Sequence, residues 1–219
     1  MPPPDGAAAQ AAAAKLGVPL DDQQAAALLA YLSLLQRWNG TYNLTAVRDP
    51  AAMWLQHVVD CLAAVPAVRA ALPVGRRARI LDVGSGGGLP GVVWAIALPQ
   101  ADVTCVDTVG KKAAFIRQAA GSLALPNLQA RHARVEALAE APFDLITSRA
   151  FASLADFTRL SRHLLASGGQ WVAMKGKPPT DELAALGWPP AMFHVEQLQV
   201  PGLDAERCLV WLKSDVAAA

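Results

Sequence analysis

The chain has 219 residues, 53% hydrophobic and 17% charged, so it can form one full α/β domain with an N-terminal extension and is not a disordered chain. Its formal net charge of +1 gives no overall field that attracts nucleic acid, so any RNA contact must depend on a local basic patch. No apolar run reaches the ~20 residues of a membrane span, and residues 1–14 lack the basic start of a signal peptide. The three cysteines are scattered without metal-ligand spacing, which predicts a reducing cytoplasm, no disulfide and no metal site.

The N-terminal third of the chain predicts a short loose tail followed by helices. Residues 21–38 carry leucines on one helical stripe, and Asn39-Gly40 predicts the end of that helix. A second helical region is expected over residues 51–71, with a bend or break at Pro66. We therefore assign residues 1–74 to an N-terminal tail and helical extension.

The next stretch of the chain is the most informative part of the sequence. Residues 79–83 form a short apolar run that predicts a buried strand, and Asp82 lies near its end. A glycine-rich turn follows, and residues 91–98 then predict a helix. Glycine lets the backbone adopt positive φ and approach a ligand closely. A strand, a glycine turn and a helix predict a nucleotide-type cofactor site in a doubly wound α/β fold.

The identity of that cofactor depends on the acidic residue. Gly86, Gly88 and Gly91 fit the G-x-G-x-x-G pattern of dinucleotide sites, which alone is a weak signal. The carboxylate of Asp82 would repel a pyrophosphate at the helix N-terminus, whereas it suits the cationic sulfonium and ammonium of S-adenosylmethionine. We therefore favour S-adenosylmethionine over a dinucleotide, with a ligand-free tight turn as the third possibility.

A second carboxylate supports the cofactor interpretation. Residues 103–107 form another β-rich run, and Asp107 follows Gly84 by about 20 residues, the spacing at which an acidic residue meets ribose hydroxyls. Its two oxygens can accept hydrogen bonds from both hydroxyls. The alternative is that Asp107 only caps the helix expected over residues 110–125.

Strands and helices alternate through the rest of the chain, which predicts a largely parallel sheet. The last two strands have no long helix between them and should pair as an antiparallel hairpin. The fold expected is α/β: the class I (Rossmann-like) methyltransferase arrangement over residues 75–215, a mainly parallel seven-stranded sheet with an antiparallel C-terminal hairpin, forming one compact unit with the N-terminal helices. The further strands are expected at 128–132, 143–148, 170–175, 193–200 and 207–213, a turn at 135–138 and a helix at 153–165.

Several strings in the chain are specific enough to identify a family. The most specific are Tyr42-Asn43-Leu44-Thr45 and Ser148-Arg149-Ala150-Phe151-Ala152. From about Leu28 to Lys213 the chain resembles the RsmG (GidB) family, bacterial methyltransferases of guanine N7 in small-subunit ribosomal RNA. The other segments that carry the resemblance are 37–50, His57-Val58-Val59-Asp60, 82–91, Met174-Lys175-Gly176 and Leu209-Val210.

The resemblance implies S-adenosylmethionine as cofactor and 16S ribosomal RNA, or the small ribosomal subunit, as partner. The scattered cysteines and the apolar runs predict a cytoplasmic protein without membrane association; a monomer is favoured, although the oligomeric state is open. The cofactor contacts that the resemblance implies are Gly84, Leu89, Val135, Glu136 and Arg149. In this interpretation Val135 packs on the adenine, Glu136 or the Val135 N–H reads the ring edge, and Arg149 holds the methionine carboxylate or binds a guanine or phosphate.

The expected chemistry requires no catalytic base. Guanine N7 carries an in-plane lone pair and no proton, so displacement at the sulfonium methyl needs alignment above all. No Asn-Pro-Pro-Tyr string or Pro-Cys pair follows the fourth strand, which disfavours exocyclic-amine and cytosine-C5 methylation. A small-molecule methyltransferase and, less favoured, an NAD-dependent oxidoreductase remain alternatives.

Other polar and aromatic residues have two interpretations each. Lys175 and Lys177 follow the fifth strand and are expected to contact RNA, or else to be solvated strand ends with Lys175 paired to an acid. His57 and Asp60 lie at i, i+3 and should form a structural pair. Trp38, with Tyr42 of the family string, could stack on a base but is more simply expected to pack between the N-terminal helices and the domain.

Overall fold

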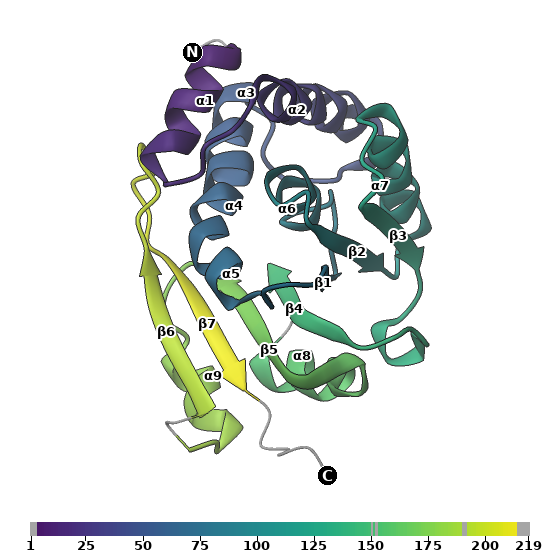
Figure 1. Ribbon diagram of the computed structural model, residues 1–219, viewed down its shortest axis with the longest axis vertical. Helices are drawn as coiled ribbons and strands as arrows, with labels where there is room; N and C mark the ends of the chain where they lie inside the picture. Colours follow the sequence, from purple (N-terminus) through teal and green to yellow (C-terminus); the bar gives the residue numbers. More distant parts are fainter. Residues whose placement is uncertain (1–3, 150, 152, 190–191, 214–219) are drawn as a thin grey trace.

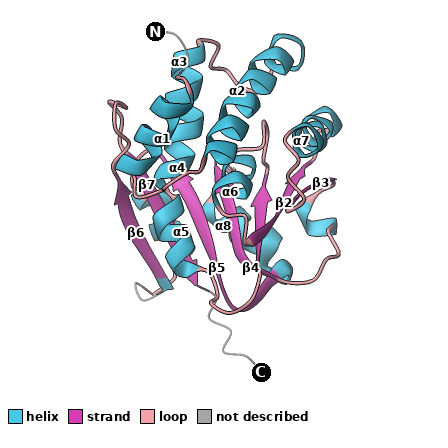
Figure 2. Ribbon diagram, turned by 45° about the horizontal axis from the view of Figure 1, so that its top comes forward, coloured by secondary structure: helices cyan, strands magenta, loops and turns pink. Residues whose placement is uncertain are grey.

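The computed structural model describes residues 4–149, 151, 153–189 and 192–213. A seven-stranded sheet forms its centre, and helices cover both faces (Figures 1 and 2). The strand order is β3-β2-β1-β4-β5-β7-β6. The strands are β1 Ala78–Val83, β2 Ala101–Asp107, β3 Leu128–His132, β4 Phe143–Arg149, β5 Leu165–Lys175, β6 Phe193–Leu198 and β7 Arg207–Lys213.

The pairing of these strands confirms the predicted mixed sheet. β1 pairs in parallel with β2 and β4, β2 with β3, and β4 with β5. β7 runs antiparallel between β5 and β6. Most expected strand bounds hold to within two residues, but β5 begins at Leu165 instead of residue 170, because the chain continues through an irregular register opposite Phe143 and Leu145.

Alternate residues of each strand feed two separate hydrophobic clusters. On one face, Ile80 and Leu145 pack with the N-terminal helices, with α6 Gly91–Ala97 and with α7 Gly110–Ser122. On the other face, Leu81 and Ile146 pack with α8 Leu154–Ser161, α9 Thr180–Leu186 and the short helices η2 Val135–Ala137 and η3 Arg162–Leu164. A period of two along the strands therefore fills both layers. The sequence patterns did not predict the helix α9.

The N-terminal part is more helical than expected. The loose tail predicted at the start falls partly on residues 1–3, which lie outside the described residues, but α1 Gly6–Lys15 follows almost at once. The Asp5 side chain caps this helix, and Ala9 is fully buried. Small residues four apart let α1 approach the long helix α2 closely, which the alanine-rich composition did not reveal.

The helix α2, Asp22–Tyr42, corrects a predicted boundary. Asp21 and Gln24 form the capping box at its start. The helix does not end at Asn39-Gly40 but continues to Tyr42, and Asn43 then adopts the left-handed conformation with φ 49°. Asn39 remains helical because its buried side chain accepts a hydrogen bond from the Thr45 N–H at 2.9 Å and donates to the Val47 carbonyl at 3.2 Å.

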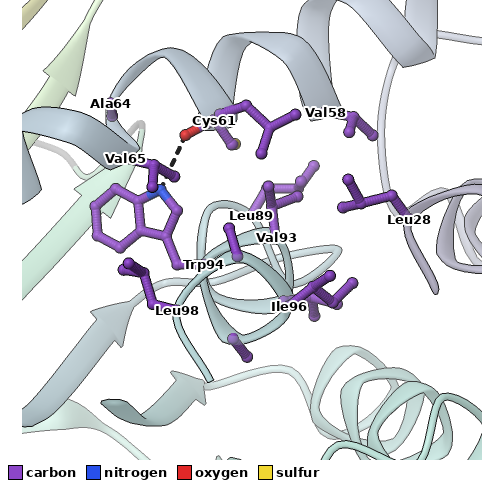
Figure 3. Close-up of a cluster of buried hydrophobic side chains, with 14 of the residues drawn as sticks. Leu28, Val58, Cys61, Ala64, Val65, Leu89, Val93, Trp94, Ile96 and Leu98 are labelled. Atoms are coloured by element: carbon purple, nitrogen blue, oxygen red, sulfur yellow. Dashed lines mark hydrogen bonds between the residues drawn. The ribbon is translucent and has the colours of Figure 1, made fainter. Parts of the chain in front are cut away.

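The second helical region covers Pro50–Ala71 in four pieces: α3 Pro50–Met53, the π-helix η1 Trp54–Val59, α4 Asp60–Ala63 and α5 Val65–Ala71. The predicted break occurs at Ala64, and Pro66 lies in the first turn of α5. No membrane-spanning segment was expected from the sequence, but by length and hydropathy this stretch could cross a membrane. However, 61% of its most apolar window is buried inside the protein. Figure 3 shows the reason: Val58, Cys61 and Val65 pack against α6.

Candidate active site

The glycine turn after β1 adopts the conformations that its glycines allow. Gly84, Gly86 and Gly88 have φ of 70°, 57° and 84°, which side chains other than glycine rarely adopt. The N–H groups of Gly84 and Ser85 both donate to the Val106 carbonyl, at 2.9 and 3.2 Å. The turn is therefore fixed to the end of β2, with its backbone at the carboxyl edge of the sheet.

Asp82 lies beneath this turn instead of facing a ligand, which corrects the expectation that its charge meets the cofactor directly. Its side chain is fully buried, and Oδ2 accepts a hydrogen bond from the Gly91 N–H at 2.9 Å. A Cβ on Gly91 would lie 2.9 Å from the same oxygen, so only glycine fits there. Burial raises the pKa of Asp82 to about 7, because it penalises the charged form. Asp82 thus attaches the start of α6 to β1.

Asp107 organises the opposite wall of the turn. Its Oδ2 accepts from the Gly86 N–H at 2.9 Å, and its Oδ1 accepts from the Val109 N–H at 2.8 Å. The residue is 6% exposed, so the carboxylate is held rigidly. A carboxylate has about four lone-pair sites, so two remain available to a ligand. Val109, not Asp107, is the N-cap residue of α7, and no side chain caps that helix, so the alternative that Asp107 only caps it is not what the structure contains. The bond to Gly86 links Asp107 to the glycine turn.

A cavity of about 320 Å³ opens between these groups. It brings together four of the residues expected to contact cofactor, namely Gly84, Asp107, Val135 and Glu136. Val135 is 5% exposed and presents an apolar wall, whereas Glu136 is exposed and ion-pairs with Arg134 at 3.6 Å. The other lining residues include Val106, Thr108, Lys112, Ala133 and Phe151. A carboxylate on one side and apolar groups on the other suit a nucleoside.

Leu89 lies elsewhere. Its side chain is 4% exposed and packs in the core between α6 and the N-terminal helices, beside Leu28 and Val93 (Figure 3). It does not line the cavity beside Gly84. Only the backbone of Leu89, whose N–H donates to the Ser85 carbonyl at 3.0 Å, belongs to the turn.

Arg149 ends β4 and points to the opposite side of the sheet edge, toward η1. Its guanidinium donates to the Gln56 carbonyl at 3.0 Å and lies 3.3 Å from His57 Nδ1 and 3.5 Å from Asp60 Oδ2. It lines a second cavity, of about 430 Å³, together with Arg207. Arg149 is thus separate from the four residues of the first cavity. The neighbouring Ala150 and Ala152 of the family string lie outside the described residues.

His57 and Asp60 do not bond to each other, so the predicted pair is wrong; each bonds to Arg149. His57 Nε2 lies 2.7 Å from Thr45 Oγ1. Because Nδ1 must accept from Arg149, the proton of the neutral ring is on Nε2. Burial, and next the Arg149 charge, lower the pKa of His57 to about 4.

Asp60 is 3% exposed and is held by two guanidinium groups. Its Oδ1 accepts from Arg207 Nε at 2.8 Å, and its Oδ2 is the oxygen near Arg149. Burial raises the pKa of Asp60, and the two arginines oppose that rise. These bonds join η1 and α4 to the ends of β4 and β7.

Lys175 and Lys177 have different surroundings. Lys175 Nζ donates to both carboxylate oxygens of Glu182 on α9, at 2.8 and 3.0 Å, and its side chain is 17% exposed. Glu182 also accepts from the Leu154 N–H at 2.8 Å, so Lys175 helps attach α9. Lys175 therefore pairs with an acid, as the alternative interpretation predicted. Lys177 is exposed.

The aromatic residues follow the packing interpretation. The Trp38 ring lies 5.1 Å from Tyr42 and 5.4 Å from Phe115 of α7, centroid to centroid.

Gln56 and Arg207, which line the second cavity, were not identified from the sequence. Their only signal was their position, near a family string and at the start of the last strand. Within the described residues, no group of three or more His, Cys, Asp or Glu could hold a metal ion.

Comparison with known proteins identifies relatives across nearly the whole chain. Residues 24–210 match the family model GidB, described as rRNA small subunit methyltransferase G. The ribosomal RNA small subunit methyltransferase G of Leptothrix cholodnii is 58% identical over 215 residues, which cover 96% of both chains. The enzyme of the same name from Acidovorax ebreus is 60% identical over 207 residues, 90% of both chains.

Solved structures of other methyltransferases share the architecture. The ribosomal protein L11 methylase of Lactobacillus delbrueckii subsp. bulgaricus superposes with a TM-score of 0.53 and 16% identity, covering 73% of this chain and 79% of that one. TrmN from Thermus thermophilus gives a TM-score of 0.51 at 23% identity, covering 70% of this chain and 49% of that one. At these identities the likeness shows the fold alone: the class I methyltransferase arrangement.

Proposed function

The chain belongs to the rRNA small subunit methyltransferase G (GidB) family, and from that membership we propose that it transfers a methyl group from S-adenosylmethionine to N7 of a guanine in 16S ribosomal RNA. An rRNA methyltransferase needs a site for its methyl donor at the carboxyl edge of the sheet. The observation that carries the proposal is the meeting of Gly84, Asp107, Val135 and Glu136 around one cavity at that edge.

The residues of the first cavity fit S-adenosylmethionine. The positive φ of Gly84 leaves the backbone bare where a Cβ would otherwise point toward Phe151, 3.5 Å away. Asp107 has lone pairs free for the two ribose hydroxyls, and Val135 offers an apolar surface to the adenine. Glu136 can accept a hydrogen bond from the adenine amino group. Leu89 contributes through its backbone at most.

The chain's own contribution to the reaction is orientation. Bound S-adenosylmethionine supplies an electrophilic methyl group on a sulfonium. Asp107 would hold the nucleoside end of the cofactor in the first cavity, and Arg149, at the end of β4, lines the neighbouring second cavity. Guanine N7 carries no proton, so no side chain has to act as a base. Alignment of nucleophile and methyl group can supply several kcal/mol of barrier reduction.

Partner and location follow from the same proposal. The substrate is 16S RNA or the small ribosomal subunit, and the enzyme works in the cytoplasm. Its three free, buried cysteines fit that reducing compartment. We also propose that it acts as a monomer. A basic contact outside the first cavity must then guide the RNA, since the net charge of the chain is only +1.

Cofactor titration tests the first part of this proposal. The parent protein should bind S-adenosylmethionine and S-adenosylhomocysteine but not NAD. Asp107→Ala should weaken both sulfur ligands by about ten- to a hundredfold, since ribose is common to them. Preferential binding of NAD, or methylation of a metabolite with no transfer to 16S RNA, would replace this proposal by one of its alternatives.

A further inference from the structure

We infer that the second cavity, between η1, β4, β5 and β7, receives the guanine nucleotide on which the enzyme acts; this inference rests on the proposed function. We call it the Arg207 cavity, lined by Gln56, Asp60, Arg149, Met174 and Arg207, among others. Its volume of about 430 Å³ lies in the range of small-ligand pockets. It is separate from the cavity beside Asp107.

The position of the Arg207 cavity suits an acceptor. It lies at the carboxyl ends of β4 and β5, whereas the first cavity lies at the ends of β1, β2 and β3. Phe151, two residues after Arg149, lines the first cavity, so the two spaces flank the end of β4. Methyl transfer requires donor and acceptor atoms about 3–3.5 Å apart. A cofactor whose nucleoside end occupies the first cavity would direct its methyl group toward the second.

The charges of the Arg207 cavity favour an anion. Arg149, Arg207 and Lys175 line it; Asp60 is the one carboxylate among the lining residues, and Glu182 pairs with Lys175, so the two arginines carry the excess positive charge. The two arginine side chains are each 23% exposed, so they are accessible, while Asp60 is nearly covered. Arg207 Nε is committed to Asp60 and Nη1 to the Glu206 carbonyl, but Nη2 donates to no described residue. A guanidinium with a spare donor matches a phosphate oxygen.

The remaining walls can hold the base. Met174 and Leu198 give apolar surface, and the side-chain amide of Gln56, half-buried, makes no hydrogen bond within the part of the chain that the structure describes. If N7 of a guanine faces the methyl donor, its N1–H and N2 amino donors point away from it. The amide oxygen of Gln56 can accept from those donors, which adenine would not present in the same arrangement.

Two substitutions test this assignment. Gln56→Ala removes the proposed base contact, and Arg207→Lys keeps the charge facing Asp60 but loses the planar fork. Arg162→Lys is the matched control, because Arg162 is an exposed arginine lining a different cavity, under α8. Steady-state methylation of unmodified 16S RNA gives KM for RNA and kcat, titration gives the S-adenosylhomocysteine affinity, and saturation-transfer NMR follows guanosine 5′-monophosphate binding with S-adenosylhomocysteine present.

We expect Gln56→Ala to raise KM for RNA about tenfold and Arg207→Lys by ten- to a hundredfold, with S-adenosylhomocysteine affinity within twofold of the parent and weaker nucleotide signals. The control should match the parent. Parent-like KM and nucleotide binding in both variants, or an equal loss of cofactor affinity, would overturn the assignment while the parent still methylates RNA. A parent protein that transfers no methyl group to 16S RNA would instead overturn the proposed function.

Discussion

Gly84 combines a positive φ with a position beside the first cavity. Its φ of 70° disfavours any side chain, and it lines the first cavity. Gly75 has φ of 81°, lies in an exposed turn and has no atom within 4 Å of a built Cβ. The two glycines therefore share the backbone requirement but not the position beside the cavity.

Substituting each of these glycines by alanine separates strain from binding. Gly84→Ala and Gly75→Ala should both lower the free energy of unfolding by about 1–2 kcal/mol, since both force a left-handed conformation. Only Gly84→Ala should also lose S-adenosylmethionine affinity, because its new methyl group would lie beside the cavity proposed for the cofactor. Urea unfolding and calorimetric titration measure the two quantities. Normal cofactor binding by a folded Gly84→Ala variant would make the turn merely structural.

Two of the buried groups with shifted pKa values, Asp82 and His57, predict opposite dependences of stability on pH. Asp82 has its folded pKa raised to about 7 from 3.8, so the stability it contributes is present below pH 3.8 and is lost as the pH rises toward 7. His57 has its folded pKa lowered to about 4 from 6.5, so its contribution is present above pH 6.5 and is lost as the pH falls toward 4. Between about pH 4 and 6.5 the two slopes oppose each other.

Asp82→Asn should therefore remove the contribution of Asp82 to the pH dependence of the free energy of unfolding and leave that of His57. Between pH 4 and 6.5 its stability should rise more steeply with pH than that of the parent, by up to about 1.4 kcal/mol per pH unit. His57→Gln should change the slope by a similar amount in the opposite direction. Urea unfolding at several pH values measures both. Profiles parallel to the parent would mean that neither group titrates as its burial implies.

At the scale of the elements, the helix α2 depends on one buried amide. Asn39→Ala leaves the Thr45 N–H and the Val47 carbonyl without their partners and should cost about 1–3 kcal/mol. Gly40→Ala, at the next, exposed position of the same helix, should instead stabilise by about 0.5–1 kcal/mol, because no atom lies within 4 Å of the new Cβ. Urea midpoints give both values, and equal effects would refute the role assigned to Asn39.

The attachment of α9 changes what the two lysines are expected to do. Lys175→Ala should loosen α9 by removing the partner of Glu182. Lys177→Ala should leave stability unchanged but lower the slope of log RNA affinity against log salt by about one unit, if Lys177 contacts a phosphate. S-adenosylmethionine affinity should remain near normal in both variants. A salt slope equal to that of the parent in Lys177→Ala would exclude this lysine from the RNA contact.

Most helices and strands could be predicted from local sequence patterns. The predictions that were wrong concern features that depend on contacts between distant parts of the chain. The glycine turn, the parallel strands and the hairpin could be predicted, because period, glycine content and alternation are properties of short segments. The inward direction of Leu89, the burial of Asp82 and the Lys175–Glu182 pair depend on segments far away in sequence. The π-helical turn η1 could not be predicted from the sequence either, since its residues differ in no simple way from those of an α-helix.

At the scale of the whole molecule, we propose that residues 1–74 and 75–215 fold as one unit. Residues from α1, α2 and α4 share one hydrophobic cluster with β1, β2 and β4, and Asp60 bonds to Arg149 and Arg207 across the proposed boundary. The unfolding curves above should accordingly show a single transition. The residues at 214–215, at the end of that range, lie outside the described part of the chain.

The placement of the site could be predicted in part at this scale too. Gly84, Asp107, Val135 and Glu136 line one cavity as expected, because each lies at or just after the end of a strand, and these strands end at the same edge of the sheet. Arg149 faces the N-terminal helices instead, since its partners come from a segment about ninety residues earlier in the chain. Gln56 and Arg207 line the second cavity only through that fold, so no motif marked them.

The central claim is methyl transfer to guanine N7 of 16S RNA, and mapping the modified nucleotide tests it most directly. Unmodified 16S RNA and small subunits are incubated with the protein and labelled S-adenosylmethionine, and the product is digested and located by mass spectrometry and by strand cleavage at N7-methylguanine. We expect one labelled guanine that cleaves as an N7-methyl derivative. Label on another base, on another atom of guanine, or on no RNA at all would contradict the account.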